Sequence, residues 1–360
     1  MTGVRDRVDL SRILTVPELE EIARERLAPG AFAYVVGGAG DERTMRDNIA
    51  AFARWRFLPR VLVDTSARSL ETTILGKRVA MPIGIAPFAL QCLLDPEGEV
   101  AMARAASKAG VLMGLSMGAN RTIEDVAAAA TCPLWFQPHL FDDQGYMREL
   151  VERSERAGYG AICLTVDSPV GGRREGAMRV PHVLPDGATW ANMPPALRVP
   201  SGKWLTGGDT WTWRDVDRVR SQTKLAIVLK GVVAPEDAKL AVEHGVRAIV
   251  VSNHGGRQLD DTIASLDALP GIVDAVDGRA DVLIDGGVRR GIDVLKALAL
   301  GARAVLVARP AAWGLAAGGQ AGVERVLELL RVELSVAMAI AGVTRVDEVP
   351  RSLLVPYQLP

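Results

Sequence analysis

Eight short apolar runs, separated from one another by segments with helical periodicity, constrain the fold of this 360-residue chain more than any other feature. The runs are centred on Ile83, Leu112, Trp135, Ile162, Ile227, Ile249, Leu283 and Leu306. Strands that alternate with helices are typical of a parallel sheet whose faces are covered by those helices. Eight such units joined by short links predict an α/β fold of the closed (β/α)8 type, the TIM barrel.

The segments between the runs carry helix boundary signals. Residues 96–110 open with Pro96 and Glu97, which suit a first helical turn, and close on Gly110, which suits a helix end. Similar patterns occupy residues 121–130, 146–158, 234–245 and 291–301. A doubly wound open sheet is the alternative fold, but it would normally bring a GxGxxG turn after the first strand, and this chain has none there.

Two segments fall outside the eight units. Residues 1–80 form an N-terminal extension with helical stretches around Leu19 and Arg46. Residues 175–212 are rich in Pro, Gly and Trp, and they predict a long loop after strand four that acts as a lid or a wall of the active site. We therefore expect one domain over residues 1–360, with the barrel at 81–345 and a C-terminal tail at 346–360.

Composition narrows the class of partner. The formal net charge is -1, so no overall positive field exists to attract nucleic acid or an anionic membrane, and a small molecule is the expected partner. The three cysteines, Cys92, Cys132 and Cys163, lack a metal-ligand spacing, so we expect no metal site. Neither a secretory signal nor a long apolar segment is present, which indicates a cytoplasmic protein that does not enter membranes.

Polar residues gather where the predicted strands end. Because catalytic groups in such barrels project from the carboxyl ends of the strands, and buried strands are otherwise apolar, this series predicts an active site at that face. The residues are Gln137, Thr165, Asp167, Lys230, Ser252, Asn253, His254, Asp285 and Arg309.

A phosphate site is predicted after strands seven and eight. The stretch DGGVRRG supplies Gly286, Gly287 and Arg289, and the stretch ARP supplies Arg309. Glycines let backbone amides approach an anion, and arginines neutralise it. A tight turn would explain DGG alone, but the two arginines favour phosphate binding.

The stretch SNHGGRQLD contains a candidate base, His254, and, three residues later, a candidate anion-binding side chain, Arg257. We expect Asp167 to face His254, where it would hold the tautomer of the ring and favour the imidazolium. Lys230 closes an apolar strand, so it should face a negative partner such as a ring that gains charge on reduction. A lysine that reaches solvent from the strand end is the alternative.

Long stretches of the chain, above all SNHGGRQLD and DGGVRRG, resemble the FMN-dependent 2-hydroxy acid oxidase and dehydrogenase family. The resemblance covers nearly the whole chain. It implies a homotetramer that binds FMN and oxidises a 2-hydroxy acid to the 2-keto acid. His254 would take a proton while two electrons pass from the substrate to flavin N5.

The resemblance also implies roles for individual residues. The residues that would contact the flavin ring are Ala89, Ser116, Gln137, Thr165, Lys230 and Ser252. The residues that would hold the ribityl and phosphate groups are Asp285, Gly286, Gly287, Arg289, Ala308 and Arg309. The residues that would bind substrate beside the base His254 are Tyr34, His139, Arg174 and Arg257.

Four positions depart from the family pattern. His139 stands where a tyrosine that would bond the substrate hydroxyl is usual, which puts substrate choice and pH response in question. Phe88 replaces a small threonine, and Gly118 replaces an aromatic residue, so the pocket is expected to be reshaped. Ala308 replaces a glycine beside the phosphate site, where a small backbone shift would accommodate its methyl group.

Oxygen is the expected electron acceptor, with a dehydrogenase that passes electrons to a quinone or other carrier as the first alternative. The second alternative is a non-redox isomerase or lyase that binds a phosphorylated substrate. The third is a binding or scaffold protein that keeps the fold but has lost catalytic activity. The loop tryptophans could form a wall for an aromatic or bulky substrate, with packing on the barrel rim as the equal alternative. Lactate, glycolate or a carrier-bound acid would also fit the pattern. These tryptophans are Trp190, Trp204, Trp211 and Trp213. His182 and His244 are expected to be surface or structural residues.

Overall fold

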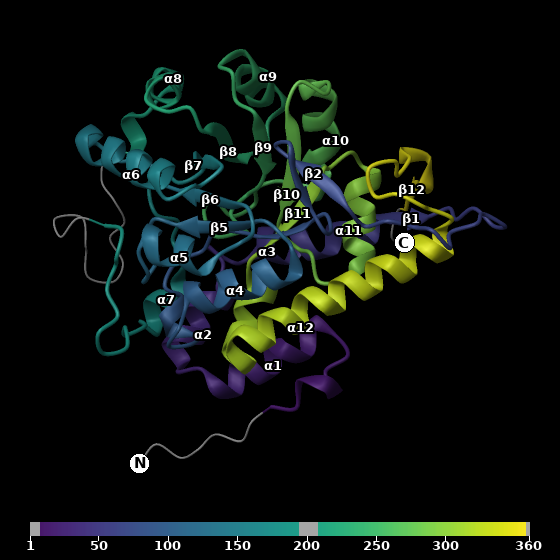
Figure 1. Cartoon of the computed structure of the whole chain (residues 1–360), viewed down its shortest axis with the longest axis horizontal. Coiled ribbons are helices and arrows are strands. Elements are labelled where there is room, and N and C mark those ends of the chain that lie inside the picture. Colours follow the sequence, from purple (N-terminus) through teal and green to yellow (C-terminus); the bar gives the residue numbers. More distant parts are fainter. Residues whose placement is uncertain (1–7, 194–207, 358–360) are drawn as a thin grey trace.

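The computed structural model describes residues 8–193 and 208–357, and eight of its parallel strands close into a barrel (Figure 1). In order around the barrel these strands are β4 (Ile83–Ile85), β5 (Met113–Ser116), β6 (Leu134–Gln137), β7 (Ala161–Thr165), β8 (Ala226–Val232), β9 (Ala248–Val251), β10 (Asp281–Asp285) and β11 (Ala304–Val307). β11 pairs with β4 through Val305 and Ile83, which closes the ring. Each predicted run contains one of these strands, so the barrel is confirmed and the open-sheet alternative is wrong.

The strands are apolar because both of their faces are buried. Alternate residues of β7 belong to two separate apolar clusters, with Cys163 in the barrel interior and Ile162 and Leu164 between the barrel and its helices. A hairpin of β2 (Thr72–Ile74) and β3 (Lys77–Val79) packs against the interior cluster. Its turn residue Leu75 donates its backbone N–H to Asp281 at the start of β10, so the hairpin lies at the amino end of the barrel.

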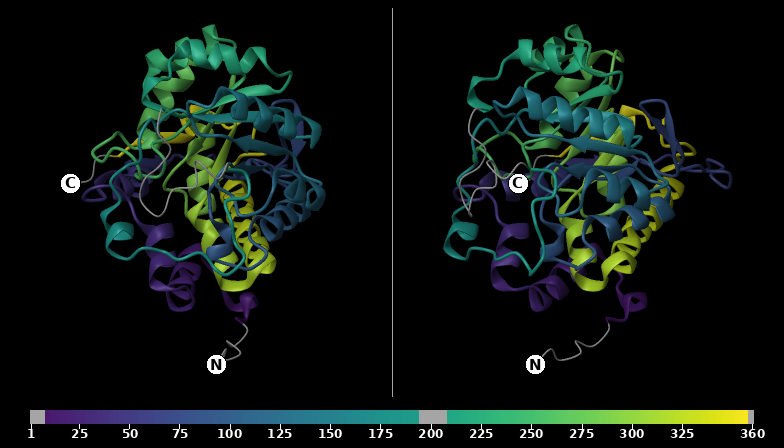
Figure 2. Two further views of the ribbon diagram at one scale, coloured as in Figure 1. Left: turned by 90° about the vertical axis from the view of Figure 1, so that its left-hand side faces the viewer. Right: turned by 60° about the vertical axis from the view of Figure 1, so that its left-hand side comes forward.

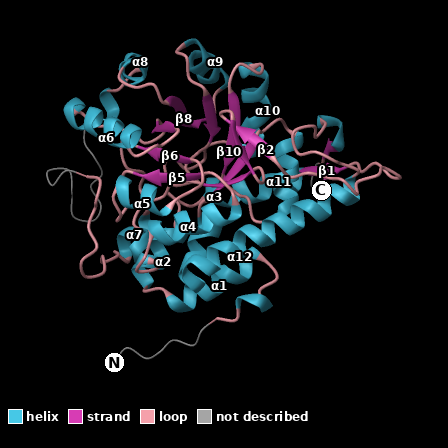
Figure 3. Ribbon diagram, in the orientation of Figure 1, coloured by secondary structure: helices cyan, strands magenta, loops and turns pink. Residues whose placement is uncertain are grey.

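Helices surround the strands on the outside (Figure 3). They are α4 (Glu99–Ala109), α5 (Ile123–Ala129), α6 (Gln144–Arg156), α8 (Trp213–Ser221), α9 (Pro235–Glu243), α10 (Ser265–Val276), α11 (Gly291–Ala299) and α12 (Arg309–Ala341). All five predicted helices are present, as α4, α5, α6, α9 and α11. α4 ends at Gly110, which has a φ of 66°, and Thr122 caps α5 by accepting the backbone N–H of Asp125.

The described part of the N-terminal extension, residues 8–80, contains three α-helices rather than the two that were expected. They are α1 (Val16–Arg26), α2 (Pro29–Val36) and α3 (Arg43–Ala50). The unpredicted helix is α2, whose sequence PGAFAYVV is apolar on all sides and therefore lacks the amphipathic pattern of a surface helix. α1 packs along α12, and both lie on one side of the barrel in all three views (Figures 1 and 2).

Short elements complete the fold. β1 (Trp55–Phe57) pairs antiparallel with β12 (Leu354–Pro356), which joins the extension to the tail. The long connection after β7 contains the short helix α7 (Glu175–Arg179). Within the described ranges no helix is long and apolar enough to cross a membrane, and no cluster of acidic, His and Cys side chains could hold a metal ion.

Candidate active site

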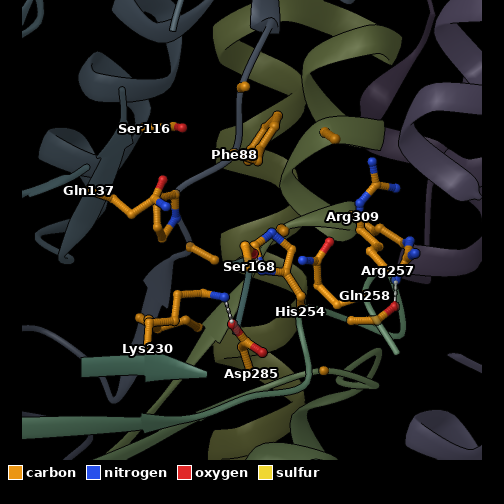
Figure 4. Close-up of a pocket in the computed structure, with 18 of the residues that line it drawn as sticks. Phe88, Ser116, Gln137, Ser168, Lys230, His254, Arg257, Gln258, Asp285 and Arg309 are labelled. Atoms are coloured by element: carbon orange, nitrogen blue, oxygen red, sulfur yellow. Dashed lines mark hydrogen bonds and ion pairs between the residues drawn. The ribbon is translucent and has the colours of Figure 1, made fainter. Parts of the chain in front are cut away.

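A pocket of about 1200 Å3, its open mouth included, lies at the carboxyl end of the barrel strands. Most of the residues predicted from the sequence line it together. They are Tyr34, Ala89, Ser116, Gln137, His139, Arg174, Lys230, His254, Arg257, Asp285, Gly286, Gly287, Arg289, Ala308 and Arg309. Figure 4 shows His254 near the middle of the pocket, with Gln137 and Lys230 on one side and Arg257 and Arg309 on the other.

Three predicted residues lie one layer behind the pocket wall. Asp167 contacts His254, Thr165 accepts a short hydrogen bond from the Gln137 amide, and Ser252 accepts from both Lys230 Nζ and the His254 backbone N–H. All three are hydrogen-bonded to residues that do line the pocket. They are therefore placed to orient pocket side chains rather than to touch a ligand directly.

His254 and Asp167 form a pair. The Nδ1 atom of His254 lies 3.0 Å from Asp167 Oδ1, and Ser168 Oγ also donates to that carboxylate oxygen at 3.1 Å. His254 follows β9 in the left-handed region with a φ of 59°, an uncommon conformation for a non-glycine residue. Because Nδ1 is engaged by the carboxylate, Nε2 is the ring nitrogen left to act in the pocket.

Burial and charge act in opposite directions on this pair. Burial lowers the pKa of His254, and the Asp167 carboxylate only partly offsets this effect. Burial would raise the pKa of Asp167, but the charges of His254 and Lys230 and two hydrogen bonds outweigh it and lower the pKa to about 2. The pair therefore keeps a carboxylate beside an imidazole that is neutral near pH 7 and can accept a proton.

Lys230 is almost completely buried, and the ammonium group has two partners. Lys230 Nζ lies 3.1 Å from Asp285 Oδ2 and donates to Ser252 Oγ at 3.0 Å. Burial alone would lower the pKa of Lys230, but the nearby carboxylates of Asp285 and Asp167 raise it above its usual value. The lysine is thus a fixed positive charge in the pocket wall, and the alternative of a side chain reaching solvent is wrong.

The other end of the pocket suits an anion. The guanidinium groups of Arg289 and Arg309 donate to backbone carbonyls, and among the described residues neither forms an ion pair within 4 Å. Burial, and then repulsion from Arg257 and Arg289, lowers the pKa of Arg309 to about 9. Arg309 is also the first residue of α12, and a helix N-terminus favours a negative group.

Gly286 and Gly287 lie in the left-handed region, with φ values of 96° and 82°. A Cβ atom on Gly287 would come within 2.0 Å of the backbone oxygen of Asn48 in α3. The second glycine is therefore required by the close approach of the N-terminal extension, a reason that the sequence did not reveal. Ala308 has a φ of -109°, so its methyl group fits without strain.

These residues fit FMN on chemical grounds. Asp285 Oδ1 is a buried acceptor with no hydrogen-bond partner among the described residues, and a ribityl hydroxyl is a donor. The arginines and the α12 N-terminus match a phosphate monoester, and Lys230 matches the edge of a ring that becomes anionic on reduction. The pocket thus offers groups of the correct type for a ribityl hydroxyl, for the phosphate and for the edge of the ring that becomes anionic.

Tyr34 and Arg257 lie together beside His254. The Arg257 guanidinium carbon is 5.3 Å from the centre of the Tyr34 ring, and its Nη1 donates to the carbonyls of Tyr34 and Gly37. Burial raises the pKa of Tyr34, so its hydroxyl stays neutral. The ring of His182 packs on Tyr34 at 5.0 Å, which places this histidine beside the pocket rather than simply on the surface.

His139 is a neutral imidazole. Burial lowers the pKa of His139 to about 3, and repulsion from the protonated form of His254 and from the charges of Lys230 and Arg174 contributes in the same direction. His139 Nε2 lies 3.3 Å from Gln137 Nε2, and the His139 and His254 rings lie 6.4 Å apart. Two imidazoles therefore border the same part of the pocket.

The loop tryptophans divide into two groups. Trp190 lies over Gly118, because a Cβ atom there would be 3.3 Å from its Cζ3 atom. Trp211 donates to the Phe141 carbonyl and Trp213 stacks on His244, so neither lines the pocket and their predicted role as a substrate wall is wrong. Trp204 lies outside the described residues.

Known proteins resemble this chain over nearly its whole length. The model of the FMN-dependent dehydrogenase family matches residues 23–356. The chain belongs to this family. An L-lactate oxidase from Nostoc sp. (strain PCC 7120) is 47% identical, over 96% of this chain and 99% of its own length. A glycolate oxidase from Spinacia oleracea is 43% identical, over 94% of this chain and 95% of its own length.

Solved structures give the same result at the level of the fold. A mandelate oxidase variant with (S)-mandelic acid superposes with a TM-score of 0.90 at 42% identity, over 96% of this chain and all of that one. Mandelate oxidase with benzoyl-formic acid superposes with a TM-score of 0.88 at 43% identity, over 96% of this chain and 98% of that one. The chain therefore belongs to a family of FMN-dependent redox enzymes, so the non-redox alternative is wrong.

Proposed function

We propose that this enzyme oxidises an (S)-2-hydroxy acid with an aromatic or bulky side chain to the 2-keto acid, and that oxygen reoxidises the flavin. The observation that carries the proposal is the His254–Asp167 pair, at 3.0 Å, in a pocket that is also lined by Lys230, Arg289 and Arg309. Bound FMN supplies a two-electron acceptor to this site.

In this proposal, Asp285, Arg289 and Arg309 hold the ribityl and phosphate groups, with Gly286, Gly287 and Ala308 as their backbone cradle. Ala89, Ser116, Gln137 and Lys230 line the place of the flavin ring, and Thr165 and Ser252 fix two of these side chains. Lys230 then presents a positive charge where negative charge develops.

Substrate orientation is assigned to two arginines and a phenol. Arg257, supported by Arg174, and the hydroxyl of Tyr34 bind the substrate carboxylate, which places the 2-carbon beside His254. His254 Nε2 accepts the proton that leaves the substrate, and Asp167 stabilises the imidazolium that results. His139, kept neutral by its surroundings, bonds the 2-hydroxyl in place of a phenol.

The proposed preference for an aromatic side chain rests on the apolar part of the pocket. Phe88 and Leu140 line it, and Trp190 lies behind the pocket wall, next to Gly118, which packs against the lining residue Ala89. Two structural relatives are mandelate oxidases with aromatic ligands, whereas sequence relatives include lactate and glycolate oxidases. Burying a substrate ring contributes about 2 kcal/mol, which corresponds to roughly a 30-fold preference.

Steady-state kinetics with (S)-mandelate, (S)-lactate and glycolate tests this preference. We expect kcat/KM for mandelate to exceed that for glycolate by at least tenfold, and hydrogen peroxide to form in equal amount to the 2-keto acid. A higher value for lactate or glycolate would contradict the aromatic preference. Turnover with an artificial acceptor but without peroxide would identify a dehydrogenase.

A further inference from the structure

Gln258 uses both ends of its side-chain amide to join two loops at the pocket. Its Oε1 accepts hydrogen bonds from Arg174 Nη2 at 2.7 Å and from the backbone N–H of Gly172 at 3.2 Å. Its Nε2 donates to the backbone carbonyls of Asp167 and Val170, both at 3.1 Å. Since these four bonds satisfy both amide protons and the carbonyl, the side chain has one well-defined orientation.

The first consequence concerns Arg174. Its Nη2 is held by Gln258 and its Nε donates to the Arg257 carbonyl at 2.9 Å, so two bonds fix the plane of the guanidinium. Burial, and then repulsion from Arg257, lowers the pKa of Arg174 to about 9. A guanidinium repelled by a neighbouring cation would move away from the pocket unless an acceptor such as the Gln258 oxygen held it in place.

The second consequence concerns the loop that carries Asp167. A Cβ atom on Gly172 would come within 2.2 Å of the Arg257 carbonyl oxygen, so the loop after β7 packs tightly against residues 257–258. Gln258 adds two donor bonds to the same loop, at Asp167 and Val170. In Figure 4 the side chain lies between His254 and Arg257, at the border between the base and the anion-binding residues.

We propose that Gln258 is a positioning residue that sets the affinity for the substrate carboxylate through Arg174. The inference rests on the proposed function, in which Arg174 supports carboxylate binding. Gln258 lines the pocket, but its amide group is fully engaged, because its four polar contacts all go to protein atoms. Its effect must therefore pass through Arg174 and the loop after β7.

A double-mutant cycle tests the route. The FMN-loaded wild type and the variants Q258M, R174M and Q258M/R174M are titrated with phenylglyoxylate, a 2-keto acid, and the dissociation constant is measured by calorimetry. We expect Q258M to raise this constant at least tenfold in the wild-type background and less than twofold in the R174M background. Non-additivity of this kind is the signature of two residues that act as a unit.

Q258E separates charge from geometry. A glutamate keeps the acceptor oxygen for Arg174 and Gly172 but replaces the two donors and places a negative charge beside the guanidinium. Its dissociation constant for phenylglyoxylate should exceed that of Q258M, and KM for a 2-hydroxy acid should rise more than kcat falls. Q144L, which removes a glutamine at the start of α6, is the control and should bind as the wild type does.

Two results would overturn the inference. One is a Q258M dissociation constant within twofold of that of the wild type. The other is an increase in the dissociation constant on Q258M that is as large in the R174M background as in the wild type. Should Q258M fail to fold, Q258E decides, because tighter binding than the wild type would contradict the expected sign. A wild type that holds FMN but binds no 2-keto acid would overturn the proposed function and this inference with it.

Discussion

At the scale of single residues, the properties of His254 are set by contacts that lie far away in the sequence. Its Nδ1 faces Asp167 at the end of β7, and its backbone N–H donates to Ser252 Oγ at 3.0 Å. His254 could be singled out from SNHGGRQLD, and its contact with Asp167 could be predicted as well. The roles of Ser168, Gln258 and Asn48 could not, because each depends on a neighbour across a loop, and no local pattern marks such a contact.

Replacing Asp167 by Asn should move the pH dependence and lower the rate. The carboxylate raises the pKa of His254, so the variant's His254 has a lower pKa and stays neutral to lower pH. Because the base acts when neutral, the acid limb of kcat/KM should shift to lower pH, while the plateau falls about 10- to 100-fold. A pH profile of flavin reduction checks both effects.

The control for this prediction is D217N. Asp217 also pairs with a histidine, His244, at 2.9 Å, but Asp217 lies on α8 and His244 directly follows α9, and neither lines the pocket. The D217N profile should match that of the wild type. A D167N profile that keeps the wild-type acid limb would contradict the assigned role of Asp167.

At the scale of elements, the barrel strands were predictable because both their faces are buried, which makes their sequences continuous apolar runs. α2 was not predictable, because its apolar sequence lacks periodicity, although it carries Tyr34 into the pocket. The packing of α3 against the turn at Gly286 and Gly287 could not be predicted from the sequence either. Asn48 forms a reciprocal pair of amide hydrogen bonds with Asn253, at 2.8 and 2.9 Å, and so connects α3 to the residue before His254.

Alanine at the two glycines of this turn should have unequal effects. Both have positive φ, but a Cβ on Gly287 meets the Asn48 backbone oxygen at 2.0 Å, whereas a Cβ on Gly286 meets Ser265 Oγ at 3.2 Å. We expect G287A to lower the free energy of unfolding by about 3 kcal/mol or more and to lose FMN, and G286A to cost about 1–2 kcal/mol. Thermal melting measures the stability of each variant, and the absorbance of bound flavin measures its FMN content. Equal losses of stability in G287A and G286A would contradict the packing role of Asn48.

At the scale of the whole molecule, one face of α12 exposes an apolar stripe. Val332, Val336 and Ile340 are 43%, 49% and 71% exposed and are spaced by four residues, which places them on the same side of the helix. Val61 and Leu62, in the segment between β1 and β2, are exposed as well. This surface is consistent with the predicted homotetramer, which stays a prediction.

Light scattering of the holoenzyme tests the assembly. We expect the mass of four chains, and we expect V336E/I340E to reduce it because two carboxylates would have to be buried at the contact. V183E, at a valine that is 85% exposed elsewhere on the chain, should leave the mass unchanged. A wild type that runs as a monomer would contradict the prediction.

The most direct test of the central claim compares the wild type with H254A by anaerobic flavin reduction, using a panel of aliphatic and aromatic (S)-2-hydroxy acids. A positioned base contributes about 10²- to 10⁴-fold. We predict that the wild type carries FMN that bleaches with at least one acid, and that H254A binds FMN equally well but is reduced at least 100-fold more slowly. An H254A enzyme that is reduced as fast as the wild type would contradict the assignment of His254 as the base.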